Sequence, residues 1–275
     1  MIATLAEVLR PARAGGYAVA GLVCLGWEDA RAYVAAAEAL GAPVILQAGQ
    51  GARAHMPVRV WGAMFRSLAE AASVPVVAHL DHGEGFEACM AGIEAGFTSV
   101  MFDGSRLPLA ENIAQTARIA EAAHRRGVSV EAELGFVGYA AGEASRGTDP
   151  AEAARFGTET GVDALAISVG NVHLMQSAVA AVDWARLAAI EAACAVPLVI
   201  HGGSGLSASD RQRMSAGEVG KINIGTELRQ AFGAALRGVL RDPGLYDRIA
   251  ILRGTEAAVE AAALAAILSC GWKGV

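Results

Sequence analysis

Three histidines each follow a short apolar run that is typical of a buried strand. They are His82, His173 and His201. Three imidazoles that converge on an open site match the ligand set of a catalytic zinc centre, which keeps a fourth position for substrate or water. A single histidine is more often a surface residue or a satisfied core residue. Three in equivalent places predict one divalent metal per chain, and imidazole ligands favour Zn²⁺.

Three carboxylates occupy comparable places. Asp81 directly precedes His82, Asp103 directly follows the strand expected at 98–102, and Glu133 ends the strand expected at 128–133. Such groups around one concave site would attract a divalent cation and supply an acid or a base. For Asp103 the alternative interpretation is a turn residue before Gly104.

The other histidines are expected to have different roles. His79 lies inside an apolar run, so we expect it to support the metal ligands rather than bind the metal. His124 stands in a helical segment beside two arginines and is expected to be structural. His55 falls in the glycine-rich segment 48–57, which is expected to be a loop, and has no partner that the sequence identifies.

These residues are positioned by a regular alternation of strand-like and helix-like segments. The expected strands are 17–23, 44–47, 76–79, 98–102, 128–133, 165–169, 197–200 and 222–224. Amphipathic or alanine-rich helical segments separate them, and the polar residues gather after the strands. This pattern predicts a single α/β domain over residues 1–275, a (β/α)8 TIM barrel whose strand ends converge on one site. The tail at about 242–275 is expected to be helical and to pack on the barrel or on a second subunit.

Two glycine-containing segments follow the seventh and eighth expected strands. In such barrels these loops commonly bind phosphate through backbone N–H groups and a helix N-terminus. Each segment alone could simply make a turn, but together they favour a phosphorylated substrate. The residues predicted to form this phosphate site are Gly202, Gly203, Ser204, Asn223, Gly225 and Thr226.

Composition limits the partners and the chemistry. The 275 residues are 54% apolar, carry a formal charge of -6 and contain no basic run, which argues against nucleic acid as a partner. No apolar stretch reaches membrane-spanning length. Four scattered cysteines suggest neither disulfides nor a thiolate metal site, so we expect a cytoplasmic protein. Lys221 and Lys273 are the two lysines, and Lys221 enters the eighth expected strand from the wrong end for a Schiff base.

The sequence resembles the class II, zinc-dependent ketose-bisphosphate aldolases, which include fructose- and tagatose-bisphosphate aldolases. The resemblance covers nearly the whole chain. Its motifs are HLDHG at 79–83, GFTSVMFDGS at 96–105, EAELG at 131–135, GNVH at 170–173, HGGSG at 201–205 and KINIGT at 221–226. It implies reversible aldol cleavage of a phosphorylated ketose, with dihydroxyacetone phosphate or a close relative as the donor, in a homodimer or homotetramer.

The resemblance also implies roles for individual residues. The three histidines would hold zinc, and Asp81 would exchange a proton with the aldehyde oxygen. Asp103 and Glu133 match positions near the metal that can act as alternative ligands. Gly202, Ser204, Asn223 and Thr226 match positions that hold the donor phosphate, with a monovalent cation nearby.

Four departures from the family pattern stand out. Leu174 replaces a usual glycine and is expected to crowd the phosphate pocket, while Val23 and Gly49 replace a usual asparagine and serine on the aldehyde side. The segment 136–147 lacks the family's adjacent acidic pair, and Glu143 is its one carboxylate. We therefore expect Glu143 to abstract the proton from a mobile loop that closes over substrate, and the aldehyde partner to be altered.

Two alternatives stay open at this stage. A barrel metallohydrolase would be expected to show a His-x-His pair after the first strand, and residues 17–24 contain no histidine. A family member that binds metabolites without catalysis is favoured by the altered 136–147 loop and by Leu174.

Overall fold

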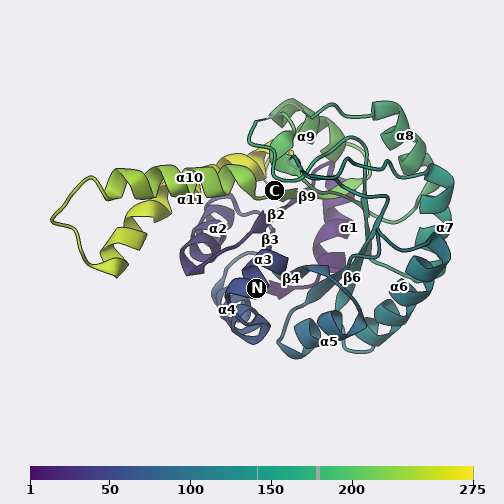
Figure 1. Ribbon diagram of the computed structural model, residues 1–275, viewed down its shortest axis with the longest axis horizontal. Coiled ribbons are helices and arrows are strands. Elements are labelled where there is room, and N and C mark those ends of the chain that lie inside the picture. The colour runs from purple at the N-terminus through teal and green to yellow at the C-terminus, as the bar shows by residue number, and fades with distance from the viewer. Residues whose placement is uncertain (141, 178–179, 275) are drawn as a thin grey trace.

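A computed structural model of the protein describes residues 1–140, 142–177 and 180–274. Eight parallel strands close into a barrel in the order β4-β3-β2-β9-β8-β7-β6-β5, and β5 pairs with β4. The barrel strands are β2 (Val19–Val23), β3 (Val44–Ala48), β4 (Val76–Gly83), β5 (Ser99–Phe102), β6 (Ser129–Leu134), β7 (Ala164–Ile167), β8 (Leu198–Ile200) and β9 (Val219–Ile224). The predicted (β/α)8 barrel is therefore confirmed (Figure 1).

Helices surround the strands. They are α2 (Trp27–Leu40), α4 (Val58–Ala71), α5 (Phe86–Glu94), α6 (Leu109–His124), α7 (Pro150–Thr160), α8 (Trp184–Ala193), α9 (Ala208–Ser215) and α10 (Thr226–Val239). Capping residues fix several helix starts, as at α7, where the Asp149 carboxylate accepts the backbone N–H groups of Ala151 and Glu152. Among the described residues, no helix combines the length and the apolar composition that crossing a membrane requires.

The barrel is closed at its N-terminal end by the first segment of the chain. Helix α1 (Leu5–Gly15) begins at the predicted Thr4–Glu7 capping box. Its buried face, which includes Leu5 and Leu9, packs on inward side chains of the strands such as Val77. Short strand β1 (Ile2–Ala3) pairs with β4 below the point where β5 joins it. This plug leaves the C-terminal end of the barrel as the open end.

Strand residues alternate between two environments, as a pleated strand requires. In β4, Val76, Ala78 and Leu80 point outward into the core beneath the helices, whereas Val77 points inward to the α1 layer. Above that apolar layer the interior becomes polar, with buried Gln47, His79, Glu131, Lys221 and Asn223. The barrel therefore carries ionisable groups in its upper half.

The predicted helical tail contains one helix, α11 (Arg248–Ser269), which pairs with α10. Figure 1 shows that α10 and α11 form an arm that extends away from the barrel. The second half of α11 packs back on α2 and buries Val259, Ala263 and Ile267. Residue 275, the end of the predicted tail, lies outside the described residues.

The segment 48–57 differs from its expected loop conformation. It contains the short helix α3 (Gln50–His55), which begins directly after β3. The indole N–H of Trp61 donates to the carbonyl of Ala52 at 3.0 Å and ties this helix to α4. Ala52, Arg53 and Ala54 favour a helix by their own propensity, and the contact with Trp61 adds to it, so the neighbouring glycines led the sequence analysis to the wrong expectation.

Candidate metal centre and active site

The three predicted imidazole ligands lie together at the open end of the barrel. One ring nitrogen of each of His82, His173 and His201 falls within 4.8 Å of the others. The ring centroids are 4.8 Å apart for His82 and His201 and 5.4 Å apart for His82 and His173. His82 lies inside β4 rather than just past its end, at a position where the register of β4 on β5 is interrupted.

Two carboxylates lie against the imidazoles. Asp103 Oδ2 is 2.8 Å from His82 Nδ1, and Glu133 Oε2 is 4.0 Å from the same nitrogen. His82, Asp103 and Glu133 also form a second cluster that one ion could reach. Both acidic residues thus lie beside the imidazole cluster.

The two ring nitrogens of His201 differ in their hydrogen-bond partners, and this difference bears on whether the site suits a metal. His201 Nε2 is 3.1 Å from Glu131 Oε1, so this side of the ring has a partner. The opposite nitrogen, Nδ1, lies 3.2 Å from Glu133 Oε2, but the angles do not make a hydrogen bond. Both atoms are buried without a hydrogen-bond partner among the described residues. Buried polar atoms are rarely left this way, so an unpaired nitrogen and oxygen facing the cluster fit a cation.

Electrostatics separate the roles of the titratable groups. Burial alone would raise the pKa of Asp81, but the imidazoles of His82 and His201 and the Lys221 ammonium outweigh it and lower the pKa to about 2. Burial and the neighbouring His201 and His82 lower the pKa of His173 to about 3. At pH 7 Asp81 is therefore ionised and His173 neutral, whereas burial alone would lower the pKa of His201 but Glu131 and Glu133 raise it to about 10.

A buried charge network below the imidazole cluster was missed by the sequence analysis. Lys221 is fully buried in β9, and its Nζ lies 2.6 Å from Glu131 Oε2 and 3.3 Å from His79 Nε2. The expectation that Lys221 stands at the wrong end of its strand is therefore wrong. The signal was available, because Lys221 and Asn223 are two residues apart and must share one strand face. Its pairing with Glu131 still leaves it a structural cation rather than a Schiff-base nucleophile.

The other histidines lie as follows. His79 Nδ1 is 2.8 Å from the Ser99 hydroxyl, so this ring is buried beneath the ligands without joining them. His124 Nε2 is 2.9 Å from Asp163 at an exposed helix end, away from the barrel mouth. His55 is exposed at the end of α3.

The phosphate-site residues come together between β8 and α10. Gly202 has a left-handed φ of 67°, and a Cβ there would come 2.3 Å from the Val172 carbonyl oxygen. Gly203 begins the 3₁₀ turn η1 (Gly203–Gly205), where a Cβ would come 2.6 Å from a side-chain carbon of Ile222. The Ser204 hydroxyl accepts the backbone N–H of Gly225 at 3.3 Å. Glycine is required at both positions, so the close approach of the loop to the start of α10 is built into the sequence.

One cavity of about 280 Å³ connects these groups. Its walls include residues of the imidazole cluster, residues predicted to bind phosphate, and three positions at which the sequence departs from the family pattern. The lining residues that carry the argument are Asp81, His82, His173, Gly202, Ser204, Asn223, Gly225, Thr226, Val23, Gly49, Leu174, Tyr139 and Arg229. Leu174, Val23 and Gly49 thus all face the space that a substrate would occupy.

Glu143 is not brought to this cavity. Its Oε2 lies 2.9 Å from Arg106 Nη1, and both side chains are more than half exposed. The 136–147 loop is instead docked on the segment that carries His173, because the N–H of His173 donates to the Gly138 carbonyl at 2.8 Å. Residue 141 of this loop lies outside the described residues.

Tyr139 is the side chain of this loop that the sequence analysis missed. Its ring stacks on His173 with centroids 4.9 Å apart and an interplanar angle of 26°, and it lines the cavity. A tyrosine in a loop without periodicity gave no signal of such a role. Its position follows from the short backbone pairing between the loop and His173.

The fold and the grouped imidazoles define the class of the protein as a (β/α)8 barrel with a candidate metal centre at its C-terminal end. Residues 3–275 match the family model "Fructose-bisphosphate aldolase class-II". The chain therefore belongs to the class II fructose-bisphosphate aldolase family, and it is a lyase of the aldolase type.

Individual relatives agree with this assignment. The chain is 38% identical to a fructose-bisphosphate aldolase of Geobacillus stearothermophilus, over 99% of this chain and 98% of that protein. The crystal structure of the YdjI aldolase from Escherichia coli K12 matches with a TM-score of 0.89 and 32% identity, over 100% of this chain and 99% of that one. Fructose-bisphosphate aldolase from Campylobacter jejuni, at 24% identity and a TM-score of 0.84, shares the fold over 98% of this chain and 95% of its own. These relatives do not favour the metallohydrolase or the non-catalytic alternative.

Proposed function

We propose that the protein catalyses reversible aldol cleavage and condensation of a phosphorylated ketose, with dihydroxyacetone phosphate or a close relative as the donor. The observation that carries this proposal is the single cavity lined by two of the imidazoles, Asp81 and the glycine-rich phosphate site. In this cavity the phosphate site would hold one end of the substrate. The metal and Asp81 would then lie beside the carbonyl and hydroxyl oxygens on either side of the carbon–carbon bond that is cleaved.

The proposed cofactor is one Zn²⁺ per chain, held by His82, His173 and His201, with Asp103 and Glu133 close enough to share or replace ligands. A zinc ion so bound would act as a Lewis acid that polarises the ketose carbonyl. The support is the donor set together with the unpaired Nδ1 of His201. The resemblance adds a monovalent cation near the phosphate site to this proposal.

Asp81 is proposed to handle the proton of the aldehyde oxygen. Its carboxylate is ionised at pH 7 because its pKa is lowered to about 2, so in the cleavage direction it acts first as a base that takes the hydroxyl proton. In the condensation direction the protonated carboxyl of Asp81 returns the proton to the aldehyde oxygen. Asn223 Nδ2 lies 3.4 Å from Asp81 Oδ1 and limits the directions in which the carboxylate can turn.

The donor phosphate is proposed to bind between Gly202, Ser204 and the start of α10. Backbone N–H groups at a helix N-terminus favour an anion there. Arg229, one turn into α10, also lines the cavity. Leu174, with φ of 57° and about half of its surface exposed, narrows this side of the entrance.

The aldehyde partner is proposed to be less phosphorylated or more apolar than glyceraldehyde 3-phosphate. Val23 and Gly49 line the cavity where hydrogen-bonding residues are expected in the family. A polar substrate group desolvated without a partner costs about 1–3 kcal/mol. Fructose 1,6-bisphosphate should then be a poor substrate.

An aldol-direction screen tests this function. Zinc-loaded protein would be supplied with dihydroxyacetone phosphate and a panel of aldehydes, with free dihydroxyacetone and pyruvate as control donors. We expect turnover only with the phosphorylated donor and a preference for unphosphorylated aldehydes. Glyceraldehyde 3-phosphate as the best acceptor would refute the altered-acceptor proposal, and an unphosphorylated donor preference would refute the phosphate site.

Two further proposals concern the whole chain. We propose a homodimer or homotetramer, supported by the exposed apolar side chains of the α10–α11 arm. We also propose a cytoplasmic location, supported by the four cysteines, which are all free thiols and buried.

A further inference from the structure

Asp81 and His82 are neighbours in β4, and both line the cavity. In a regular strand adjacent side chains point to opposite faces, so one of these two should point outward. The backbone resolves the conflict at His82, which has a left-handed φ of 50° at the break in register between Leu80 and Gly83. A bulge of this kind re-aims a side chain, and here it turns the imidazole toward the cluster.

This conformation is unfavourable for a residue with a Cβ. Histidine visits the left-handed region more readily than branched residues, but the surroundings must still stabilise it. Of the described non-glycine residues, His82 and Leu174 are the two with positive φ, and both lie at this cavity. A contact is therefore needed to stabilise the left-handed backbone conformation of His82 in β4.

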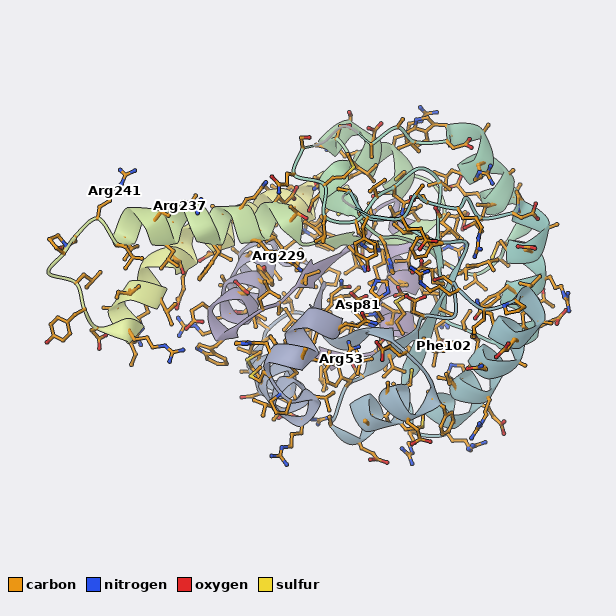
Figure 2. All side chains as sticks on the ribbon, in the orientation of Figure 1. Arg53, Asp81, Phe102, Arg229, Arg237 and Arg241 are labelled. Atoms are coloured by element: carbon orange, nitrogen blue, oxygen red, sulfur yellow. The ribbon has the colours of Figure 1, made fainter. Side chains whose placement is uncertain are left out.

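Arg53 of α3 makes that contact. Its guanidinium donates to the carbonyl of Asp81, to the carbonyl of His82 at 2.9 Å and to the carbonyl of Ala48 at 2.6 Å. The two carbonyls of β4 lie on either side of the His82 N–H, and Ala48 ends the neighbouring strand β3. Figure 2 labels Arg53 and Asp81 close together at this end of the barrel. A planar guanidinium can bridge three carbonyls in one plane, which a lysine ammonium matches poorly.

We propose that Arg53 is a positioning residue that holds the left-handed backbone of His82 and so aims its imidazole at the metal. Arg53 does not line the cavity, so it touches neither the metal position nor the substrate. This inference rests on the proposed metal centre. Helix α3 carries Arg53 to the carbonyls, and Trp61 holds α3.

The first test is independent of any metal. Hydrogen exchange of the metal-free Arg53→Met protein should become at least several-fold faster for amides at 80–84, with no change in β6. Arg59→Met is the matched control, because Arg59 is an exposed arginine at the start of α4 and should leave both regions unchanged. Unchanged exchange at 80–84 in Arg53→Met would overturn the proposal.

The second test measures the metal centre. Co²⁺ affinity, by competition with a chromophoric chelator, should fall about 10- to 100-fold in Arg53→Met, with a changed visible spectrum, as for other groups that orient ligands. Arg53→Lys should recover part of the affinity. If Arg53→Met kept the wild-type Co²⁺ affinity and spectrum, the positioning role of Arg53 would be refuted. If Arg53→Met does not fold, a folded Arg53→Gln variant with wild-type affinity and spectrum would refute it equally. Wild-type protein that bound no Co²⁺ would instead sink the proposed metal centre, while the exchange test would still decide the role of Arg53.

Discussion

At the residue scale, Asp81 lies among positively charged groups, but its carboxylate is not fully paired with them. Its carboxylate makes one long contact with Asn223 and lies 3.9 Å from His79 Nε2, so one oxygen stays available to substrate. Replacing Asp81 by Asn keeps the shape and removes the base. We expect turnover to fall by about 10² to 10⁴-fold, the usual contribution of a general base.

Metal content and cleavage rate, measured on the same sample of Asp81→Asn, check this role. Zinc should remain near one per chain, because Asp81 is not among the proposed ligands. Asp163→Asn, which alters a carboxylate paired with His124 at the C-terminal end of α6, serves as the control and should keep full activity. Near-normal turnover in Asp81→Asn would assign the proton to another group.

The second residue-scale prediction concerns the buried pair of Glu131 and Lys221. Removing one partner of a buried ion pair leaves an uncompensated charge and costs about 3–5 kcal/mol. Glu131→Gln should therefore lower the free energy of unfolding of the metal-free protein by about this amount at pH 7. The double variant Glu131→Gln with Lys221→Met should recover most of the loss, because no buried charge is left alone.

The pH dependence of this loss has a definite sign. Burial would raise the pKa of Glu131, but the Lys221 ammonium and the His201 imidazole hold it well below its ordinary value of 4.5. A depressed folded-state pKa stabilises the protein fully above that ordinary value, and the stabilisation is lost as the pH falls below it. The difference between wild type and Glu131→Gln in urea unfolding should therefore shrink as the pH falls below about 4.5. A difference that grew on acidification would contradict the assigned ionisation.

At the scale of elements, sequence periodicity was sufficient for the barrel but not for its irregular parts. Strands such as β7 and β8 are continuous apolar runs, and a capping residue marks the start of helices such as α7, so the alternation of strands and helices could be predicted. The three histidines and Asp81 follow from that alternation, since strand ends of a barrel converge. Helix α3 was missed because the glycines beside it were interpreted as a loop, although Ala52 and Ala54 favour a helix. The bulge at His82 could not be predicted, because the contacts of Arg53 with the carbonyls of β4 join segments that are distant in the sequence.

The 136–147 loop gives the prediction that belongs to this scale. Glu143 can serve as the proton abstractor only if it leaves Arg106 and the loop rearranges over the substrate. An exposed ion pair of this kind contributes at most about 1 kcal/mol, so the pairing is a weak obstacle. We expect Glu143→Gln to slow exchange of the enolisable hydrogen of the donor into deuterated water by about 10²-fold or more.

Exchange followed by NMR measures this step separately from cleavage. Glu152→Gln, an exposed glutamate in the first turn of α7, is the control and should exchange at the wild-type rate. If Glu143→Gln exchanged as fast as wild type, another group at the cavity would abstract the proton. Tyr139, which stacks on His173, would be the next residue to replace.

At the scale of the whole molecule, the α10–α11 arm leaves apolar side chains without cover. Leu240 is 54% exposed, Ile249 62% and Tyr246 91%, all at the outer end of the arm. Figure 1 shows that the connection between α10 and α11 projects away from the barrel. A second copy of the chain could bury these residues in a symmetric, self-complementary contact.

The oligomer is therefore expected to depend on the end of the arm rather than on the barrel. Replacing Ile249 by Asp should weaken association by about 2 kcal/mol or more, roughly 30-fold in Kd, because it places a charge in the proposed apolar contact. Sedimentation equilibrium over a range of protein concentrations gives that constant directly. Val60→Asp changes a similarly exposed aliphatic residue on α4, 42% exposed, and should leave the assembly intact. A monomeric wild-type protein at micromolar concentration, or an Ile249→Asp variant that assembles as tightly as wild type, would remove the arm from the interface.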